Sequence, residues 1–282
     1  MQRPAGESTH SEWVENRPSS GWFPRIDLGE LWRYRELAYF LALRDLKLRY
    51  RQTFFGIAWA ILQPLAGVAI FSIVFGRLVD VPHDGIPYPV FVYAGLVIYT
   101  YFSNGLEEAS LSLVDKAELV SKVYFPRLLA PLAAVLPGLL DVGVSLVILG
   151  LFMALYGVGP DAAIVLLPLW IVAAVAVTAG VSFWLSALNV QYRDVKHTLT
   201  FLVQAWLFAT PVVYASSVFE GAWRYVFALN PLVGVLDGFR WSLLSGPPPG
   251  PEDLVSLGVG LLILGGGVIY FQRFERRFAD VI

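Results

Sequence analysis

Long stretches without a single ionisable side chain constrain this sequence more than any other feature. Residues 162–192 contain no Asp, Glu, Lys, Arg or His, and the same holds for residues 52–76. A helix of about 20 apolar residues crosses the roughly 30 Å hydrocarbon layer of a membrane. The 57% hydrophobic and 15% charged residues extend this pattern to the whole chain. We therefore predict an all-α protein that crosses a membrane several times.

Apolar runs that alternate with polar segments predict six transmembrane spans. The expected spans are residues 53–76, 89–105, 128–157, 162–188, 198–216 and 254–272. Together with an amphipathic segment before them they form one membrane domain, residues 31–272. Residues 1–30 are a polar, flexible tail without the apolar core of a signal peptide, and residues 273–282 form a short polar end. Residues 216–250 mix aromatic and charged side chains, which predicts short interfacial or re-entrant helices rather than another crossing.

Positive charges are distributed unevenly between the predicted loops, which sets the orientation. One side carries the arginines of residues 33–51, Lys116, Lys122, Arg127, Arg193, Lys196 and the last arginines. The other side carries only Arg77, Arg224 and Arg240. Because cytosolic loops are enriched in Lys and Arg, both termini are expected in the cytosol.

A basic helix is predicted directly before the first span. Three cations share a helical spacing of i, i+3 and i+7: Arg44, Lys47 and Arg51. A neighbouring apolar stripe has the same spacing: Leu43, Leu46 and Tyr50. Such a helix lies in a membrane surface with its cations among anionic headgroups. The other interpretation is an ordinary positively charged flank of a span.

Several classes of function are excluded or disfavoured by what the sequence lacks. It has no cysteine, no Gly-x-x-x-x-Gly-Lys-Ser/Thr phosphate loop and no Gly-x-Ser-x-Gly elbow, and its three histidines are scattered. The net charge of −2 gives no nucleic-acid footprint. We expect a protein without its own enzymatic site, metal or cofactor, which takes its energy from a partner or a gradient.

Three further groups of residues are candidates for function. Asp141 is the one acid deep within an expected span, so it is either a functional site or bonded to the backbone of a bent helix. Aromatic residues of the second and fifth spans are suited to line a passage for sugars, although packing and interfacial roles explain most such residues: Tyr93, Tyr99, Tyr101, Phe102, Trp206 and Phe208. The charged stretch after the second span is either a solvated loop or the place where a cytosolic motor pushes: Asp115, Lys116, Glu118, Lys122, Tyr124 and Arg127.

Four stretches together resemble the ABC-2 type permeases that export polysaccharides, the family that includes O-antigen and teichoic-acid exporter permeases. They are residues 44–64, Lys-Val-Tyr-Phe-Pro-Arg at 122–127, residues 189–197 and residues 230–241. The resemblance runs from about residue 31 to the end, in order and spacing. It is specific for the family and less so for the cargo.

The resemblance implies a homodimer in the bacterial inner membrane, driven by two copies of a separate cytosolic ATPase that binds ATP and magnesium. It also implies a polysaccharide carried on polyprenyl pyrophosphate, contact between the loop after the second span and the ATPase, and an outer re-entrant motif with Asn230, Pro231 and Arg240. Combined with the basic helix, it predicts that the lipid pyrophosphate is held by Arg44, Lys47, Arg49 and Arg51.

Two other functions remain open from the sequence. An ABC-2 exporter of a small lipid or drug would have a narrow cleft instead of a wide passage. A membrane-embedded glycan transferase would need clustered carboxylates or a metal pair at a membrane face, and the sequence shows neither.

Overall fold

The computed structural model describes residues 28–51, 58–79, 81–122, 125–192 and 194–281. All regular secondary structure in these ranges is helical, without a β-strand, as the sequence predicted. The helices of the first half are α1 (Leu28–Arg33), α2 (Arg35–Arg51), α3 (Ala58–Phe71), a π-helix (Ser72–Leu78), α4 (Tyr88–Asp115) and α5 (Ala117–Lys122). Those of the second half are α6 (Leu129–Val135), α7 (Gly138–Tyr156), α8 (Leu167–Gln191), α9 (Val195–Ala209), α10 (Ala222–Phe227), α11 (Leu232–Leu244) and α12 (Pro251–Val281). Short 3₁₀ turns precede α8 and α10, at Ala162–Leu166 and Ser216–Val218.

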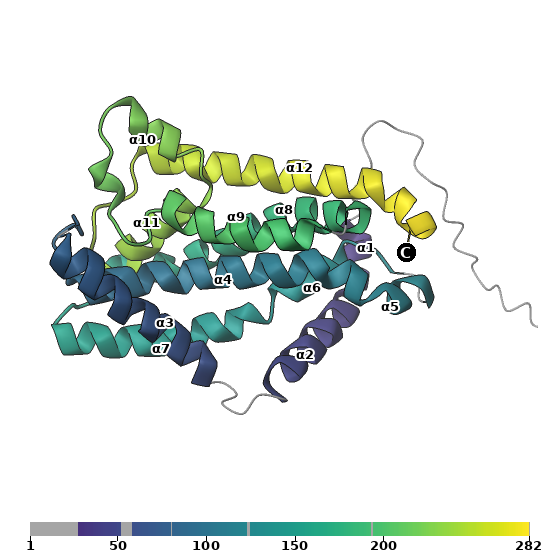
Figure 1. Ribbon diagram of the computed structural model, residues 1–282, viewed down its shortest axis with the longest axis horizontal. Helices are drawn as coiled ribbons and strands as arrows, with labels where there is room; N and C mark the ends of the chain where they lie inside the picture. The colour runs from purple at the N-terminus through teal and green to yellow at the C-terminus, as the bar shows by residue number, and fades with distance from the viewer. Residues whose placement is uncertain (1–27, 52–57, 80, 123–124, 193, 282) are drawn as a thin grey trace, which may run out of the picture.

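Helix α4 is the centre of the bundle and packs against α3, α6, α7, α8 and α9. Its side chains from Val90 to Phe102 are buried on all sides except at Thr100. A helix that is apolar all round is typical of a position surrounded by other helices. The length of α4 therefore determines the long axis of the molecule in Figure 1.

Helices α8 and α12 lie unusually close together because small residues meet where they cross. A Cβ atom at Gly180 would lie 2.8 Å from the backbone of Leu264, and one at Gly267 would lie 2.5 Å from the carbonyl oxygen of Gly180. Beside this crossing, Trp184 donates a hydrogen bond from Nε1 to the carbonyl of Ile263 (3.1 Å). Small residues at helix crossings are the usual means of association in membranes, where apolar side chains gain nothing by leaving lipid.

Four helical segments among the described residues are long and apolar enough to cross a membrane: Ile61–Leu78, Leu129–Tyr156, Ala162–Gln191 and Pro251–Glu275. They correspond to the first, third, fourth and sixth expected spans. The other two expected spans coincide with α4 and α9, which lie in the same bundle but do not meet those criteria. The number of crossings beyond these four stays a prediction.

Three helix ends differ from the expected boundaries of the spans. The second span was expected to end at residue 105, but α4 continues to Asp115 because Glu108 finds a partner on another helix. The fifth was expected to reach residue 216, but α9 ends at Ala209 before Pro211. The final segment, 273–281, is not a separate tail but the last part of α12.

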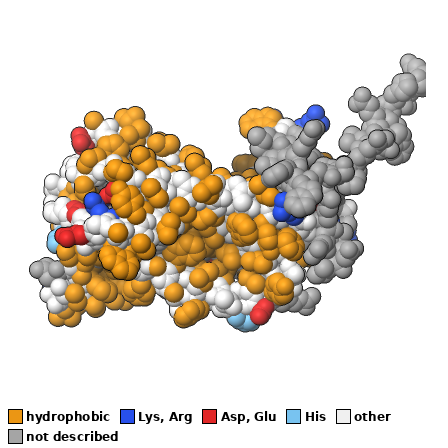
Figure 2. Space-filling view, turned by 90° about the horizontal axis from the view of Figure 1, so that it is seen from above, with side chains coloured by type: hydrophobic (Ala, Val, Ile, Leu, Met, Phe, Trp, Pro, Cys, Tyr) orange, Lys and Arg blue, Asp and Glu red, His pale blue; other side chains and the backbone are white. Residues whose placement is uncertain are grey.

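The surface has the character expected for lipid contact. Figure 2 shows one face covered largely by hydrophobic side chains, with charged side chains toward the two ends. Large apolar side chains point outward along the bundle, among them Val147, Val165 and Leu262, which are 75%, 80% and 77% exposed. We call the end with α2 and α5 the α2 end and the opposite end the α10 end; they lie at the right and left of Figure 1.

Candidate functional site

Helix α2 lies at an angle beside the bundle and packs against α6. Ala38 and Leu41 are buried at this contact, whereas Tyr39 and Phe40 are each 63% exposed on the other side. The spacing of three between Ala38 and Leu41 places them on one face of the helix. The helix therefore presents its second half, with its cations, beside α4 and α7.

Arg49 of α2 forms ion pairs with acids from two other helices. Its Nη1 lies 2.5 Å from Oδ2 of Asp141 at the start of α7, and its Nη2 pairs with Glu108 of α4. The side chains of Arg49 and Asp141 are only 22% and 18% exposed. A partly buried carboxylate needs such a partner because the loss of water is costly for a charge. Asp141 was expected to be either a functional site or bonded to the backbone of a bent helix. In the structure it pairs with Arg49, which is distant in sequence but adjacent in space.

A second ion pair joins α2 to the end of α4. Lys116 Nζ lies 2.6 Å from Oδ2 of Asp45, and the lysine side chain is 6% exposed. Asp45 also pairs with its neighbour Arg44 (3.0 Å). Lys116 is thus buried beside α2, and its predicted contact with a cytosolic motor stays a prediction.

These ion pairs border a cavity of about 690 Å³ between α2 and α4. Its lining contains three cations and four acids: Arg44, Arg49, Lys116, Asp45, Glu107, Glu108 and Asp115. Leu48 of α2 and Leu111 of α4 are its apolar walls. A cavity of this size, with charges of both signs in its wall, has room for a small polar group.

The four predicted headgroup cations differ in their surroundings. Arg44 and Lys47 are exposed, and Arg44 faces the cavity. Arg49 is engaged by acids, as described above. The side chain of Arg51 lies outside the described residues.

The predicted coupling residues are likewise divided. Asp115 is exposed, and on α5 the exposed Glu118 and Lys122 form an ion pair one turn apart. Arg127 is bound to the last helix: its Nη1 donates to the carbonyl of Glu275 (2.9 Å), and its backbone nitrogen donates to Oε1 of Glu275 (3.2 Å). Tyr124 lies outside the described residues.

Most of the aromatic candidates pack inside the subunit. Tyr93, Tyr99, Tyr101 and Phe102 are at most 6% exposed. Tyr93 stacks on Phe152 with ring centroids 5.3 Å apart, Tyr99 donates a hydrogen bond to the carbonyl of Val203, and Phe102 meets the edge of Trp206 at 5.1 Å. Phe208 is 58% exposed. A passage-lining role stays a prediction, and Phe208 is the candidate that does not require repacking of α4.

Asn230 is the main connection at the α10 end. Its Oδ1 accepts from Trp206 Nε1 and from the backbone nitrogen of Leu232, both at 3.1 Å. Its Nδ2 donates to the carbonyl of Ala209 (3.1 Å) and to Thr210 Oγ1 (2.9 Å). With Pro231 as the residue before α11, Asn230 holds the end of α9 against the start of α11.

Arg240 is buried, contrary to the expectation that charges of this segment lie at the surface. It is 4% exposed and donates to three backbone carbonyls, those of Pro211 (2.6 Å), Val212 (2.7 Å) and Phe91 (3.3 Å). Its guanidinium also lies 3.6 Å from the centroid of the Phe91 ring. Gly95 makes this possible, since a Cβ there would lie 2.6 Å from Arg240 Nη2. Sequence reasoning missed this role because no local pattern shows which carbonyls an arginine reaches.

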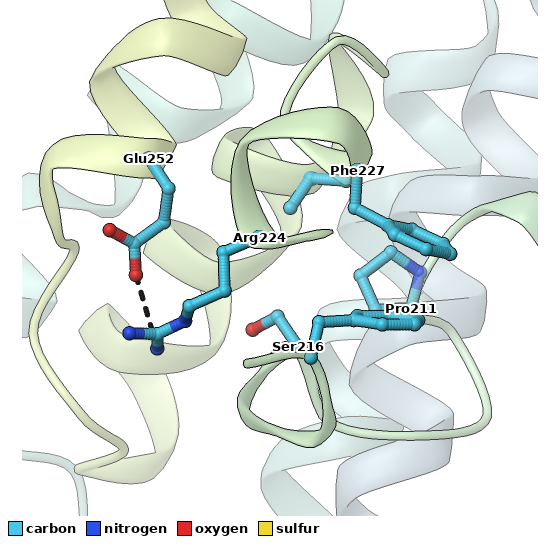
Figure 3. Close-up of a pocket in the computed structure, with 7 residues that line it drawn as sticks. Pro211, Ser216, Arg224, Phe227 and Glu252 are labelled. Atoms are coloured by element: carbon cyan, nitrogen blue, oxygen red, sulfur yellow. Dashed lines mark ion pairs between the residues drawn. The ribbon is translucent and has the colours of Figure 1, made fainter. Parts of the chain in front are cut away.

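A small pocket also lies at the α10 end (Figure 3). Its lining includes Pro211, Ser216 and Phe227, and Arg224 forms an ion pair there with Glu252 at 3.1 Å. Phe219 and Phe227 stack with centroids 3.5 Å apart. The free volume of about 10 Å³ is that of one water molecule, so the pocket is closed to a sugar.

Within the described ranges, no three His, Asp or Glu side chains are arranged to bind a metal ion. The larger cavity at the α2 end is thus the candidate site. Glu108 and Asp45, which partner its cations, were not singled out from the sequence. In the sequence, Asp45 and Glu108 are marked only as acidic residues next to basic or apolar positions of a helix, which does not indicate their partners.

Comparison with known proteins gives the family context of this arrangement. Residues 36–244, most of the chain, match the family described as "ABC-2 type transporter". A relative named "O-antigen export system permease protein RfbA", from Myxococcus xanthus, is 30% identical over 257 residues, which are 90% of this chain and 98% of the relative. Two Klebsiella pneumoniae proteins of the same name are 25% and 24% identical, each covering 92% of this chain and 98% of its own length.

Proposed function

Because this chain belongs to the ABC-2 type transporter family, we propose that it is the permease subunit of an ATP-driven exporter of a polysaccharide linked to polyprenyl pyrophosphate. An O-antigen-like cargo is favoured over a teichoic-acid-like one by the names of its relatives. The observation that carries the proposal is the cavity between α2 and α4, which places exposed cations at one end of a bundle of membrane-length helices.

The proposed assembly contains a second copy of this chain and two copies of a cytosolic ABC ATPase, in the bacterial inner membrane with both termini in the cytosol. The cations at the α2 end support this orientation, since Arg77, Arg224 and Arg240 all belong to the α10 end. ATP with magnesium would bind to the ATPase. Helix α5, with Glu118 and Lys122 exposed at the α2 end, is the surface proposed to receive its motion.

The lipid pyrophosphate is proposed to enter beside α2. Arg44 and Lys47 are exposed there and are able to form charge-assisted hydrogen bonds to phosphate. The apolar lipid tail would remain in the membrane along the exposed side of α2, which carries Tyr39 and Phe40. In this proposal the anionic headgroup contacts the exposed cations of α2, and the apolar tail contacts its exposed aromatic side chains.

The test is the double substitution Arg44→Gln and Lys47→Gln, measured as polysaccharide at the cell surface. Loss of about 1–2 kcal/mol of headgroup binding lowers export about five- to thirtyfold. Arg35→Gln, an exposed arginine on the same helix but remote from the cavity, is the control and leaves export unchanged. We expect the ATPase to co-purify with the wild type, the double variant and the control variant alike. Normal surface polysaccharide in the double variant would contradict the proposed role.

A further inference from the structure

Arg49 connects three helices at the wall of the cavity. It belongs to α2, Glu108 to the extended part of α4, and Asp141 to the first turn of α7. Both acids bind the same guanidinium group, one at each Nη atom. Without Arg49 the two carboxylates would repel each other at short range in a partly buried place. The position of α2 against α4 and α7 is therefore tied to where the Arg49 guanidinium lies.

Arg49 is also the least exposed of the three predicted phosphate-binding cations of α2 whose side chains are described. Arg44 and Lys47 are exposed, whereas Arg49 is 22% exposed and both of its Nη atoms are bonded to carboxylates. A phosphate group binds arginine with the same forked geometry as a carboxylate does. Phosphate and the two acids thus compete for the same N–H groups. Phosphate is unable to take them while α2 keeps its present place.

Glu108 is accessible from the cavity, since 38% of its side chain is exposed and it lines the wall. An anion that has bound Arg44 therefore lies in the same cavity as the Arg49–Glu108 pair. Transfer of Arg49 from the acids to this anion breaks its ion pairs with α4 and α7 and leaves the Asp45–Lys116 pair between α2 and the end of α4. If the anion binds more tightly when α2 is released than when Arg49 holds it, anion binding favours the release of α2, and the release of α2 favours anion binding.

We propose that Glu108 and Asp141 form an acid lock on Arg49, which keeps α2 closed over the cavity until a phosphate-bearing headgroup takes Arg49 from them. The identity of the headgroup rests on the function proposed above; the lock itself does not. Arg49 is then a positioning residue in the closed state and a phosphate ligand only in the open one.

The test measures the distance between α2 and α4 directly. The chain contains no cysteine, so spin labels on Leu48→Cys of α2 and Leu111→Cys of α4 are the only ones present. Both positions line the cavity. The full-length labelled chain is diluted with unlabelled chain in lipid nanodiscs, so that the distance distribution reports pairs within one subunit.

Arg49→Glu places three acids together and is expected to shift the distances to longer values by more than the width of the wild-type distribution. Adding Glu108→Arg to Arg49→Glu re-creates an opposite-charge pair and restores the short distances, which also shows that the variant chain folds. Arg35→Glu, a charge reversal of an exposed arginine on the same helix but remote from the cavity, leaves the distances unchanged. Wild-type distances in Arg49→Glu would overturn the acid lock.

The second arm adds polyprenyl pyrophosphate to the wild-type nanodiscs, with the corresponding polyprenol as control. The pyrophosphate is expected to shift the distances as Arg49→Glu does, and the polyprenol is not. Glu108→Gln with Asp141→Asn is expected to show the longer distances without any added lipid. If polyprenyl pyrophosphate does not shift the distances, the proposal that phosphate takes Arg49 from the two acids is overturned. Neither arm uses export, so the result is separate from that of Arg44→Gln with Lys47→Gln, which tests the proposed function.

Discussion

Arg49 at the α2 end and Arg240 at the α10 end are both withdrawn from water, but they are held by different partners. Arg49 is bonded to the carboxylates of Glu108 and Asp141 beside a large cavity. Arg240 is bonded to three backbone carbonyls and stacks over Phe91, and the small pocket beside Pro211 has a free volume of only about 10 Å³.

The difference separates a rearrangeable contact from a permanent one. Carboxylate side chains can be replaced by another anion, because they can rotate away and remain hydrated. Backbone carbonyls at the end of α9 have no such freedom, and they need a donor once they are buried. A buried arginine on carbonyls is thus part of the fold, whereas one on acids beside a cavity is suited to a change of partner.

Among the substitutions that test this comparison, Arg240→Met is expected to change stability most. Arg240→Met removes three hydrogen bonds and leaves buried carbonyls without donors, so we expect a loss of about 3–5 kcal/mol in the free energy of unfolding. The measurement is thermal unfolding of the purified protein in detergent. Arg224→Met, which removes an arginine that is 45% exposed at the same end, is the control and changes the melting temperature little. Equal melting temperatures for wild type and Arg240→Met would contradict a structural role.

A smaller effect is expected from pH at the α10 end. Burial raises the pKa of Asp237 on α11 to about 7, and Arg240 nearby lowers it only in part, while Asp253 and Asp84 raise it further. The folded state then binds a proton at a pH where the unfolded chain has lost it. The stabilisation is full below the ordinary aspartate pKa of about 4, and it is lost progressively as the pH rises from there through about 7.

Asp237→Asn removes this dependence. We expect wild type and variant to melt at similar temperatures at about pH 4, and the wild type to melt progressively lower than the variant as the pH is raised to about 8. Asp115→Asn, an exposed acid at the α2 end, serves as control and leaves the pH profile of the wild type unchanged. A constant difference between wild type and Asp237→Asn at all pH values would refute the raised pKa.

The smallest effect on stability is expected on α5. Glu118 and Lys122 are 82% and 69% exposed, so removing the pair with Glu118→Gln changes the free energy of unfolding by less than about 0.5 kcal/mol. If α5 contacts the ATPase as proposed, the same variant reduces ATPase activity in the reconstituted complex, with Asp161→Asn at a distant exposed turn as control. Unaltered ATPase activity would remove these residues from the contact.

The helical class and the four longest apolar segments were predictable because lipid imposes a simple rule on composition. A run of about 20 uncharged residues is long enough to cross the hydrocarbon layer, and a helix satisfies all of its backbone hydrogen bonds there. The exact ends of α4 and α9 were not predictable from hydropathy. Glu107 and Glu108 look like the start of a polar loop, yet α4 continues through them because Arg49 neutralises one of them.

The sequence predicted individual residues of the candidate site but not how they pair. Sequence spacing selected Arg44, Lys47 and Arg51 as cations of one helix and Asp141 as an acid within a span. Arg49 was added to these cations only together with the family resemblance. The pairing of Arg49 with Asp141, at positions 92 residues apart, came only from the tertiary structure.

By itself, the sequence determined that the chain is an all-helical membrane protein of the ABC-2 type, since apolar length and family motifs are local properties. Only the tertiary structure decided which charges are bound to one another, because ion pairing depends on the distance between side chains from different helices. That distance is set by how the helices pack, and packing depends on small residues and buried side chains distributed over the whole chain.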